Sequence, residues 1–215
     1  MPEVEWSTFS RPLLLDASCP RVQVGIPSAN SWLSFQSSRD QALTSLFTGL
    51  RRCIEEVRRP AREIDAILFC EGPGSTLGLR AAITLVKTLG CQITPNPPIF
   101  AYNALEIASI LAPLSSAPII ADYRQGQWYL RETSGDIRVI DEAEAIEVAP
   151  SSQPLRQRKS WKQLPETGPE VDYDLSRLAG LGAISPFLRS VEAPSLFDPR
   201  PATFRKWDES KGKKK

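Results

Sequence analysis

The residues best suited to bind a ligand gather in a glycine-rich segment of the first half of the chain. This segment, Gly72-Pro73-Gly74-Ser75-Thr76-Leu77-Gly78-Leu79-Arg80, lies between an apolar stretch and a helical pattern. The backbone N–H groups of such a turn and the positive end of the following helix can hold a phosphate. The candidate phosphate-site residues are Gly72, Gly74, Ser75, Gly78 and Arg80.

The spacing of this loop differs from two common phosphate-binding patterns. A Walker loop ends in Gly-Lys-Ser/Thr, and no lysine is present here. A Rossmann fingerprint is Gly-x-Gly-x-x-Gly, and here the third glycine comes one residue later. A structural interpretation is favoured by these residues: the first two glycines form a tight turn, Ser75 caps the helix, and Gly78 lets that helix pack closely.

Three acidic residues each follow a stretch that is predicted to be a strand: Asp16, Glu71 and Asp122. Acids at strand ends can surround a magnesium-bound nucleotide in a cleft between two lobes. They can equally be turn or helix-end carboxylates that bond only to their own backbone. The second interpretation is favoured, because the accompanying glycine segment fits a phosphate site poorly.

Composition excludes several kinds of chemistry. The chain has 215 residues and no histidine, so Ser-His-Asp and Cys-His triads and histidine-containing zinc sites are excluded. The net charge of +1 gives no overall field that would attract nucleic acid. The four cysteines contain no C-x-x-C pair, and we expect buried or idle thiols at Cys19, Cys53, Cys70 and Cys91.

Hydropathy indicates a globular cytoplasmic protein. The chain is 41% hydrophobic and 24% charged, which is enough for a sizeable core. The longest apolar stretches are far shorter than the roughly 20 residues of a spanning helix, and the N-terminus lacks a secretion pattern.

Apolar spacing in the first hundred residues predicts the order β-β-β-α-β-α, the plan of a ribonuclease-H-like half. The predicted strands cover 13–15, 22–26, 31–36 and 64–70, and the predicted helices cover 39–58 and 76–90. Ser38 and Gln41 have the spacing of a capping box at the start of the first helix.

The second half repeats part of this pattern. Ile119-Ile120-Ala121-Asp122 mirrors Leu13-Leu14-Leu15-Asp16, and a predicted strand follows it at 127–131. A capping-box pair, Asn103 and Glu106, opens a helix between the two halves. Later we expect a long connection over 150–170 and a helix capped by Asp174. The expected divisions are an N-terminal half at 1–100, a smaller C-terminal half at 101–205 and a flexible basic tail at 206–215.

Four segments, in order, resemble the TsaB (YeaZ) family, a paralogue of the Gcp/TsaD-like proteins. The stretch from Asp65 through Arg80 is similar to its signature D-A-[IV] followed by G-P-G-S-F-T-G-L-R-[IV]-G. Leu15–Ser18 resembles the opening I-D-T-S, and 122–129 resembles the hairpin D-A-R-R-x-E-V-Y. Pro201-Ala202-Thr203-Phe204-Arg205 is similar to the terminal P-x-Y-[LV]-R.

The resemblance implies an α/β fold of the actin/hexokinase/Hsp70-like (ASKHA) class, made of two ribonuclease-H-like halves with mixed sheets. It also implies a non-catalytic subunit that binds and activates TsaD in threonylcarbamoylation of tRNA adenosine 37, with a TsaE-like ATPase as a further partner. No cofactor and no metal site are expected. TsaD-like proteins hold their metal through an H-x-x-x-H pair, which a chain without histidine cannot supply.

Family complexes use helices of the N-terminal half as the TsaD interface. The candidate interface residues are Leu43, Leu46, Phe47, Leu50, Leu79, Ala82, Ile83 and Val86. The chain departs from the family pattern in the glycine segment, where Thr76 and Leu77 replace Phe and Thr. Ala17 replaces the threonine of the opening motif, which weakens any nucleotide contact there.

Two alternatives remain open. One is a magnesium-dependent nucleotide phosphotransferase or hydrolase of the same fold that uses Asp16 and Asp122, with ATP and magnesium as its cofactors. The other is a homodimeric interaction protein that has lost TsaD. A direct tRNA contact would rest on the basic run 156–162 or the lysines of the tail, which we interpret as solvated segments. Trp128 and Tyr129 are interpreted as hairpin packing.

Overall fold

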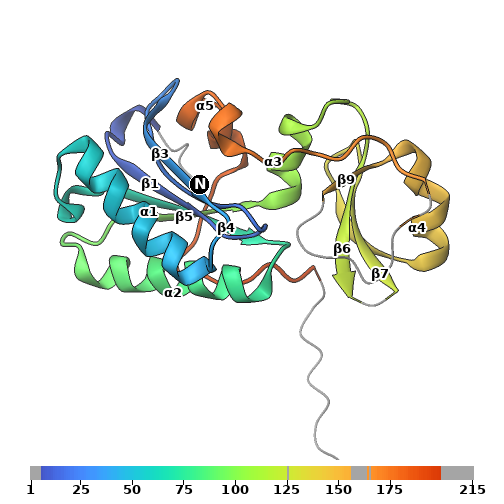
Figure 1. Ribbon diagram of the computed structural model, residues 1–215, viewed down its shortest axis with the longest axis horizontal. Coiled ribbons are helices and arrows are strands. Elements are labelled where there is room, and N and C mark those ends of the chain that lie inside the picture. The colour runs from blue at the N-terminus through green and yellow to red at the C-terminus, as the bar shows by residue number, and fades with distance from the viewer. Residues whose placement is uncertain (1–5, 125, 156–163, 165, 200–215) are drawn as a thin grey trace, which may run out of the picture.

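The computed structural model describes residues 6–124, 126–155, 164 and 166–199, which form two lobes, each built on a β-sheet (Figure 1). The first lobe holds a six-stranded sheet in the order β10-β5-β4-β1-β2-β3. The second holds a four-stranded sheet in the order β8-β7-β6-β9. Both sheets mix parallel and antiparallel pairs, so the expected α/β fold of two halves with mixed sheets is confirmed.

The strands of the first sheet are β1 (Pro12–Asp16), β2 (Val22–Pro27), β3 (Trp32–Ser38), β4 (Ala66–Gly72), β5 (Ile99–Asn103) and β10 (Arg189–Ser190). The helices beside it are α1 (Ala42–Val57), α2 (Thr76–Gln92) and α5 (Gly180–Ile184), and α3 (Ala104–Leu111) lies between the sheets. The second lobe contains β6 (Ile119–Arg124), β7 (Gln127–Arg131), β8 (Ile137–Asp141), α4 (Glu142–Val148) and β9 (Gln153–Leu155). Short 3-10 turns cover Trp6–Thr8, Ala61–Glu63, Ala149–Ser151, Leu175–Arg177 and Ser185–Phe187. No helix within these described ranges is long and apolar enough to cross a membrane.

Successive side chains of a strand point to opposite faces of a sheet, and β1, β2 and β4 are buried on both faces. In β1, Leu13 and Leu15 pack with the residues of α1 and α2, whereas Leu14 packs with α3 and α5. Figure 1 shows α1 and α2 side by side on one face of this sheet, running in the same direction. Their N-terminal ends therefore lie at the same end of the lobe, the end nearest the second lobe.

The sequence predicted the N-terminal caps of α2 and α3 but not that of α1. Ser75 caps α2 as expected, because its hydroxyl accepts a bond from the Gly78 N–H (3.3 Å). Asn103 caps α3 by accepting a bond from the Leu105 N–H (2.9 Å). The expected capping box of α1 is wrong, because the N-cap is Gln41 and its side chain makes no cap bond.

The last described segment returns to the first lobe. The expected boundary near residue 100 places residues 101–205 in the C-terminal half, yet β10 pairs antiparallel with β5 in the first sheet. The helix expected after Asp174 is divided into the 3-10 turn Leu175–Arg177 and α5. The division falls at Gly180, which has a φ of +62° and packs directly on the Ser28 and Ser31 carbonyls. The expected long connection over 150–170 contains β9, and residues 156–163 and 165 lie outside the described part.

Gly78→Ala tests the close approach of α2 to the turn after β1. An added methyl group would overlap the Ala17 carbonyl oxygen, so we expect a loss of at least about 2 kcal/mol in the free energy of unfolding. Gly90→Ala in the same helix is the matched control, because its methyl group would lie 3.5 Å from Ile99 Cδ1. The control should stabilise the chain by up to about 1 kcal/mol. Urea unfolding of both variants checks this, and equal effects would contradict it.

Candidate functional site

The acid at the end of β1 is sealed inside the protein. Asp16 is fully buried, and its Oδ1 accepts a bond from the Ser18 N–H (2.8 Å). Its Oδ2 accepts bonds from the hydroxyls of Tyr102 (2.7 Å) and Tyr173 (2.9 Å). Both carboxyl oxygens are thus occupied by donors of the chain itself. The interpretation of Asp16 as a cleft acid is therefore corrected: its charge is satisfied internally and it does not reach a solvent-open site.

Burial governs the ionisation of this cluster. It raises the pKa of Asp16, while the bonds from Ser18 and the two tyrosines act in the opposite direction. Burial also raises the pKa of Cys19 to about 12, and the nearby Asp16 charge adds to this effect. The pKa values of Tyr102 and Tyr173 are raised for the same two reasons. Neither a thiolate nor a phenolate is available here at neutral pH, so the cluster is suited to structure and not to nucleophilic chemistry.

The glycine segment packs against the turn after β1. The Ser75 N–H donates to the Ser18 carbonyl (2.7 Å), and the Gly78 N–H is bonded to the Ser75 hydroxyl. Gly74 lies directly on Ser18, and a side chain at this position would overlap its backbone. Gly72 has a φ of +114°, a conformation that favours glycine. Two of the N–H groups at this turn are therefore engaged within the chain, which supports the structural interpretation over a phosphate site.

The acid at the end of β4 is also engaged. Glu71 is only 5% exposed, and its carboxylate forms an ion pair with Arg189 of β10. Its carbonyl oxygen accepts a bond from the Phe197 N–H (2.9 Å). The returning C-terminal segment thus neutralises the second acid proposed for the cleft.

An interlobe cavity of about 350 Å³ brings together four of the residues predicted for the phosphate site or the acidic cleft. Glu71, Gly74, Arg80 and Asp122 all line it, while Asp16 does not. The sequence interpretation missed several other residues of its wall, among them Tyr123, Arg124, Tyr129, Phe197 and Asp198. The hairpin motif contained the signal for Arg124 and Tyr129, since both lie in the segment that resembles D-A-R-R-x-E-V-Y.

The aromatic wall of this cavity is packed within itself. The rings of Tyr123 and Tyr129 meet edge to face at 4.6 Å between centroids. The guanidinium of Arg124 lies over the Tyr123 ring at 5.0 Å. Trp128, on the other face of β7, belongs to the core of the second lobe, as does Ile120 beside it. Hairpin packing is therefore what these aromatic residues do in this structure.

Burial divides the candidate interface residues. Leu43 and Phe47 of α1 are 56% and 53% exposed. The other six are buried and pack with the first sheet, so the expectation that they contact a partner is corrected: Leu46, Leu50, Leu79, Ala82, Ile83 and Val86. Leu77, at the N-terminal end of α2, is 78% exposed and was not among the expected interface residues.

Some predicted features fall outside the described residues. These are the terminal motif Pro201–Arg205, the basic run 156–162 and the tail 206–215. Within the described ranges, no group of three or more cysteine, aspartate or glutamate residues is placed to hold a metal ion. Cys19, Cys53 and Cys70 are buried free thiols, and Cys91 is an exposed one.

Comparison with known proteins shows which fold this is. No protein-family model and no curated protein sequence matches the chain. A structure of YeaZ from Pseudomonas aeruginosa matches at 24% identity with a TM-score of 0.50, over 61% of this chain and 64% of that one. The crystal structure of an uncharacterized protein with similarity to peptidase YeaZ from Pseudomonas aeruginosa matches at 19% identity with a TM-score of 0.59. This second match covers 87% of this chain and 99% of the other. The expected resemblance to YeaZ is thus confirmed at the level of the fold.

Asp16→Asn tests the buried cluster through the pH dependence of stability. Burial raises the pKa of Asp16 above its ordinary value of 3.8, so the folded chain binds this proton more tightly than the unfolded chain. Stability from this group is complete below pH 3.8 and is lost as pH rises through the raised pKa. We compare the free energy of unfolding of wild type with that of the variant. The wild-type value minus the variant value should fall as pH rises from 3.8 to the raised pKa, by about 1.4 kcal/mol for each pH unit between them.

Urea unfolding at a series of pH values from about 4 upward measures this difference. Tyr102→Phe is a useful second variant, because it removes a hydroxyl that favours the ionised carboxylate. Its stability should keep falling to a higher pH than that of wild type, because the pKa of Asp16 is raised further. A difference between wild type and Asp16→Asn that stays constant or grows with pH would contradict the prediction.

Proposed function

We propose that this chain is a non-catalytic subunit that binds and activates a TsaD-like protein in threonylcarbamoylation of tRNA adenosine 37, together with a TsaE-like ATPase. The observation that carries the proposal is the sealed carboxylate of Asp16 within a YeaZ-type fold. The chain has the two lobes of this fold, and the acid at the end of its first strand, Asp16, bonds to other parts of the chain.

The chemistry of the described residues supports an accessory role. The chain has no histidine, and the candidate acids Asp16 and Glu71 are engaged by Tyr102, Tyr173 and Arg189. The N–H groups of Ser75 and Gly78 at the glycine segment are also engaged. These features leave little with which to bind and activate a phosphate, so we assign the group-transfer chemistry to the partner.

The partner surface that we propose is the helix-end patch, which consists of Leu43, Phe47 and Leu77. Leu43 and Phe47 are four residues apart on α1 and so lie on the same face of that helix. Leu77 belongs to the first turn of α2, whose N-terminal end lies at the same end of the lobe (Figure 1). All three side chains are more than half exposed. Exposed apolar side chains mark a protein contact where they form one patch, which is what we propose for these three.

The interlobe cavity favours the alternative function, a magnesium-dependent nucleotide enzyme, because Arg80, Asp122 and Glu71 line one cavity. Calorimetry with ATP and magnesium separates the two functions. The accessory role predicts no binding to the isolated chain at micromolar concentration. The alternative predicts binding that Asp122→Ala abolishes and that supports ATP hydrolysis.

Phe47→Glu tests the helix-end patch. A charge in place of this apolar side chain should weaken binding to the TsaD-like protein of the same organism by at least about tenfold, because buried aromatic residues dominate interfaces. Ile146→Glu on α4 is the matched control, since Ile146 is 48% exposed but lies on the second lobe. The control should leave affinity unchanged. Biolayer interferometry gives the affinities, and mass spectrometry of digested tRNA reports the modified nucleoside.

Three results would count against this proposal. Failure of the wild-type chain to associate with the TsaD-like protein at micromolar concentration would reject the partner. Equal losses in the Phe47 and Ile146 variants would reject the helix-end patch. Light scattering that shows a wild-type homodimer converted to a monomer by Phe47→Glu, with no TsaD binding, would support the homodimeric alternative. Unchanged melting temperatures should accompany both substitutions, because both side chains are exposed.

A further inference from the structure

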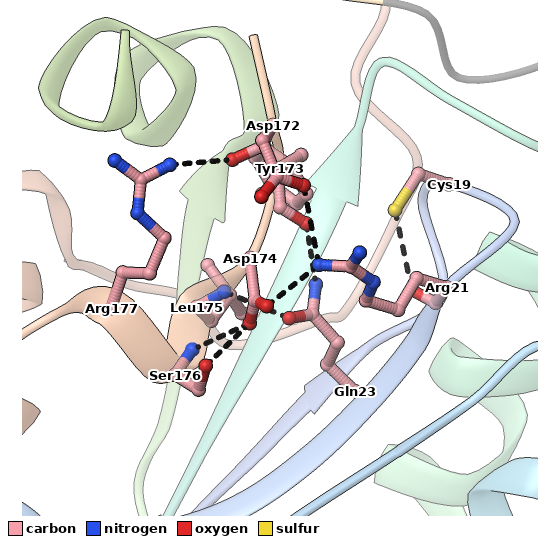
Figure 2. Close-up of polar contacts among 9 residues, drawn as sticks. All are labelled: Cys19, Arg21, Gln23, Asp172, Tyr173, Asp174, Leu175, Ser176 and Arg177. Carbon is pink, nitrogen blue, oxygen red and sulfur yellow. Dashed lines mark hydrogen bonds and ion pairs between the residues drawn. The ribbon is translucent and has the colours of Figure 1, made fainter. Parts of the chain in front are cut away.

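The chain passes from the second lobe back to the first through residues 171–178, which we call the crossing segment. Figure 2 shows this segment against Cys19, Arg21 and Gln23, at and after the β1–β2 turn. It follows β9 of the second lobe and ends at Leu178, just before α5 of the first lobe. Any change in the angle between the lobes must therefore bend this segment or detach it.

The crossing segment is hydrogen-bonded to both lobes at positions that are close together in the sequence. On the second lobe, the Val171 N–H donates to the Pro154 carbonyl (3.0 Å). On the first lobe, the buried amide of Gln23 donates to the Tyr173 carbonyl (3.3 Å) and accepts from the Leu175 N–H (2.8 Å). A single residue separates the two anchors, so little free chain is left to act as a hinge.

Side-chain contacts strengthen the anchor on the first lobe. Arg21 pairs with Asp174 (2.7 Å) and Asp172 (3.3 Å), as Figure 2 shows. The Tyr173 hydroxyl reaches the buried carboxylate of Asp16, which lies beneath the segment. The Trp32 indole N–H donates to the Leu178 carbonyl (3.0 Å). Because Asp16 and Gln23 are fully buried, releasing the segment would leave polar groups without partners inside the protein.

The space beneath the crossing segment is filled by a continuous hydrophobic core. One cluster of buried side chains includes Leu68 of the first sheet, Leu105 of α3 and Leu155 of the second sheet. Val171 and Tyr173 of the crossing segment belong to the same cluster. Lobes that move against each other usually meet through smaller and more polar interfaces. A shared core of this kind resists opening because opening would expose it to water.

We propose that the crossing segment is a latch that holds the two lobes at one fixed orientation, so that this chain does not open and close between them. The latch consists of the Gln23 clamp on Tyr173 and Leu175, the Arg21 ion pairs and the Tyr173–Asp16 bond. The chain then acts as one rigid body. The inference concerns motion within this chain and holds whether or not a TsaD-like partner binds.

Spin-label distance measurements test the latch. One label is placed on each lobe by Lys87→Cys and Glu147→Cys, both at exposed positions, with Cys91→Ser to remove the exposed natural thiol. A reference pair within the first lobe uses Gln41→Cys and Lys87→Cys. The interlobe distance distribution should be single and no broader than that of the reference pair. A broad or two-peaked interlobe distribution would overturn the proposal.

Latch variants locate the cause of this rigidity. The double variant Gln23→Met with Tyr173→Phe removes three latch bonds while keeping the side-chain volumes similar, and it should broaden the interlobe distribution. Tyr102→Phe is the matched control, because it also removes a hydroxyl that donates to Asp16. The bond that it removes joins β5 to β1 within the first lobe and does not involve the crossing segment. It should leave the distribution narrow.

Each remaining outcome also decides the question. A folded double variant with an unchanged narrow distribution would overturn the latch and assign rigidity to the core alone. Equal broadening by Tyr102→Phe would overturn it as well, because the effect would then be general loosening around Asp16. If the double variant does not fold, Tyr173→Phe alone must broaden the interlobe distribution more than Tyr102→Phe. Circular dichroism and thermal melts report folding in every case.

Discussion

The structure depends on one constraint, the burial of a carboxyl group at the end of β1. A buried acid must have its oxygens bonded, because an unsatisfied polar group inside a protein is costly. Asp16 meets this requirement with the Ser18 N–H and the hydroxyls of Tyr102 and Tyr173. These donors come from the adjacent turn, from β5 and from the crossing segment. The carboxyl group thus joins parts of the chain that are far apart in sequence.

The same turn determines how α2 is placed. The Ser18 N–H donates to Asp16, and the Ser18 carbonyl oxygen accepts a bond from the Ser75 N–H at the start of α2. The helix can approach this closely only because Gly74 and Gly78 have no side chains. A glycine segment that in other folds leaves room for a phosphate here leaves room for the protein's own backbone.

Because the interior of the chain is packed, its surface is where it can contact other molecules. The shared hydrophobic core and the crossing segment join the lobes, and the apolar side chains of Leu43, Phe47 and Leu77 remain exposed on the first lobe. A rigid body with an exposed apolar patch is suited to binding another protein, since little conformational entropy is lost on association. The interlobe cavity brings three of the predicted charged residues, Glu71, Arg80 and Asp122, around open space.

The sequence by itself determined the element order from β1 to α2, the caps of α2 and α3, and the exclusion of histidine chemistry. These follow from apolar periodicity, from local side-chain bonds and from composition, all of which act over a few residues. Only the tertiary structure decided the fate of Asp16, because its partner Tyr173 lies 157 positions away and no local pattern marks that pairing. It also separated exposed Phe47 from buried Leu46, which are neighbours in one apolar pattern. The sequence also did not predict β10, with which the chain returns to the first sheet. A strand of two residues has no periodicity, and this one is recognised by its pairing with β5.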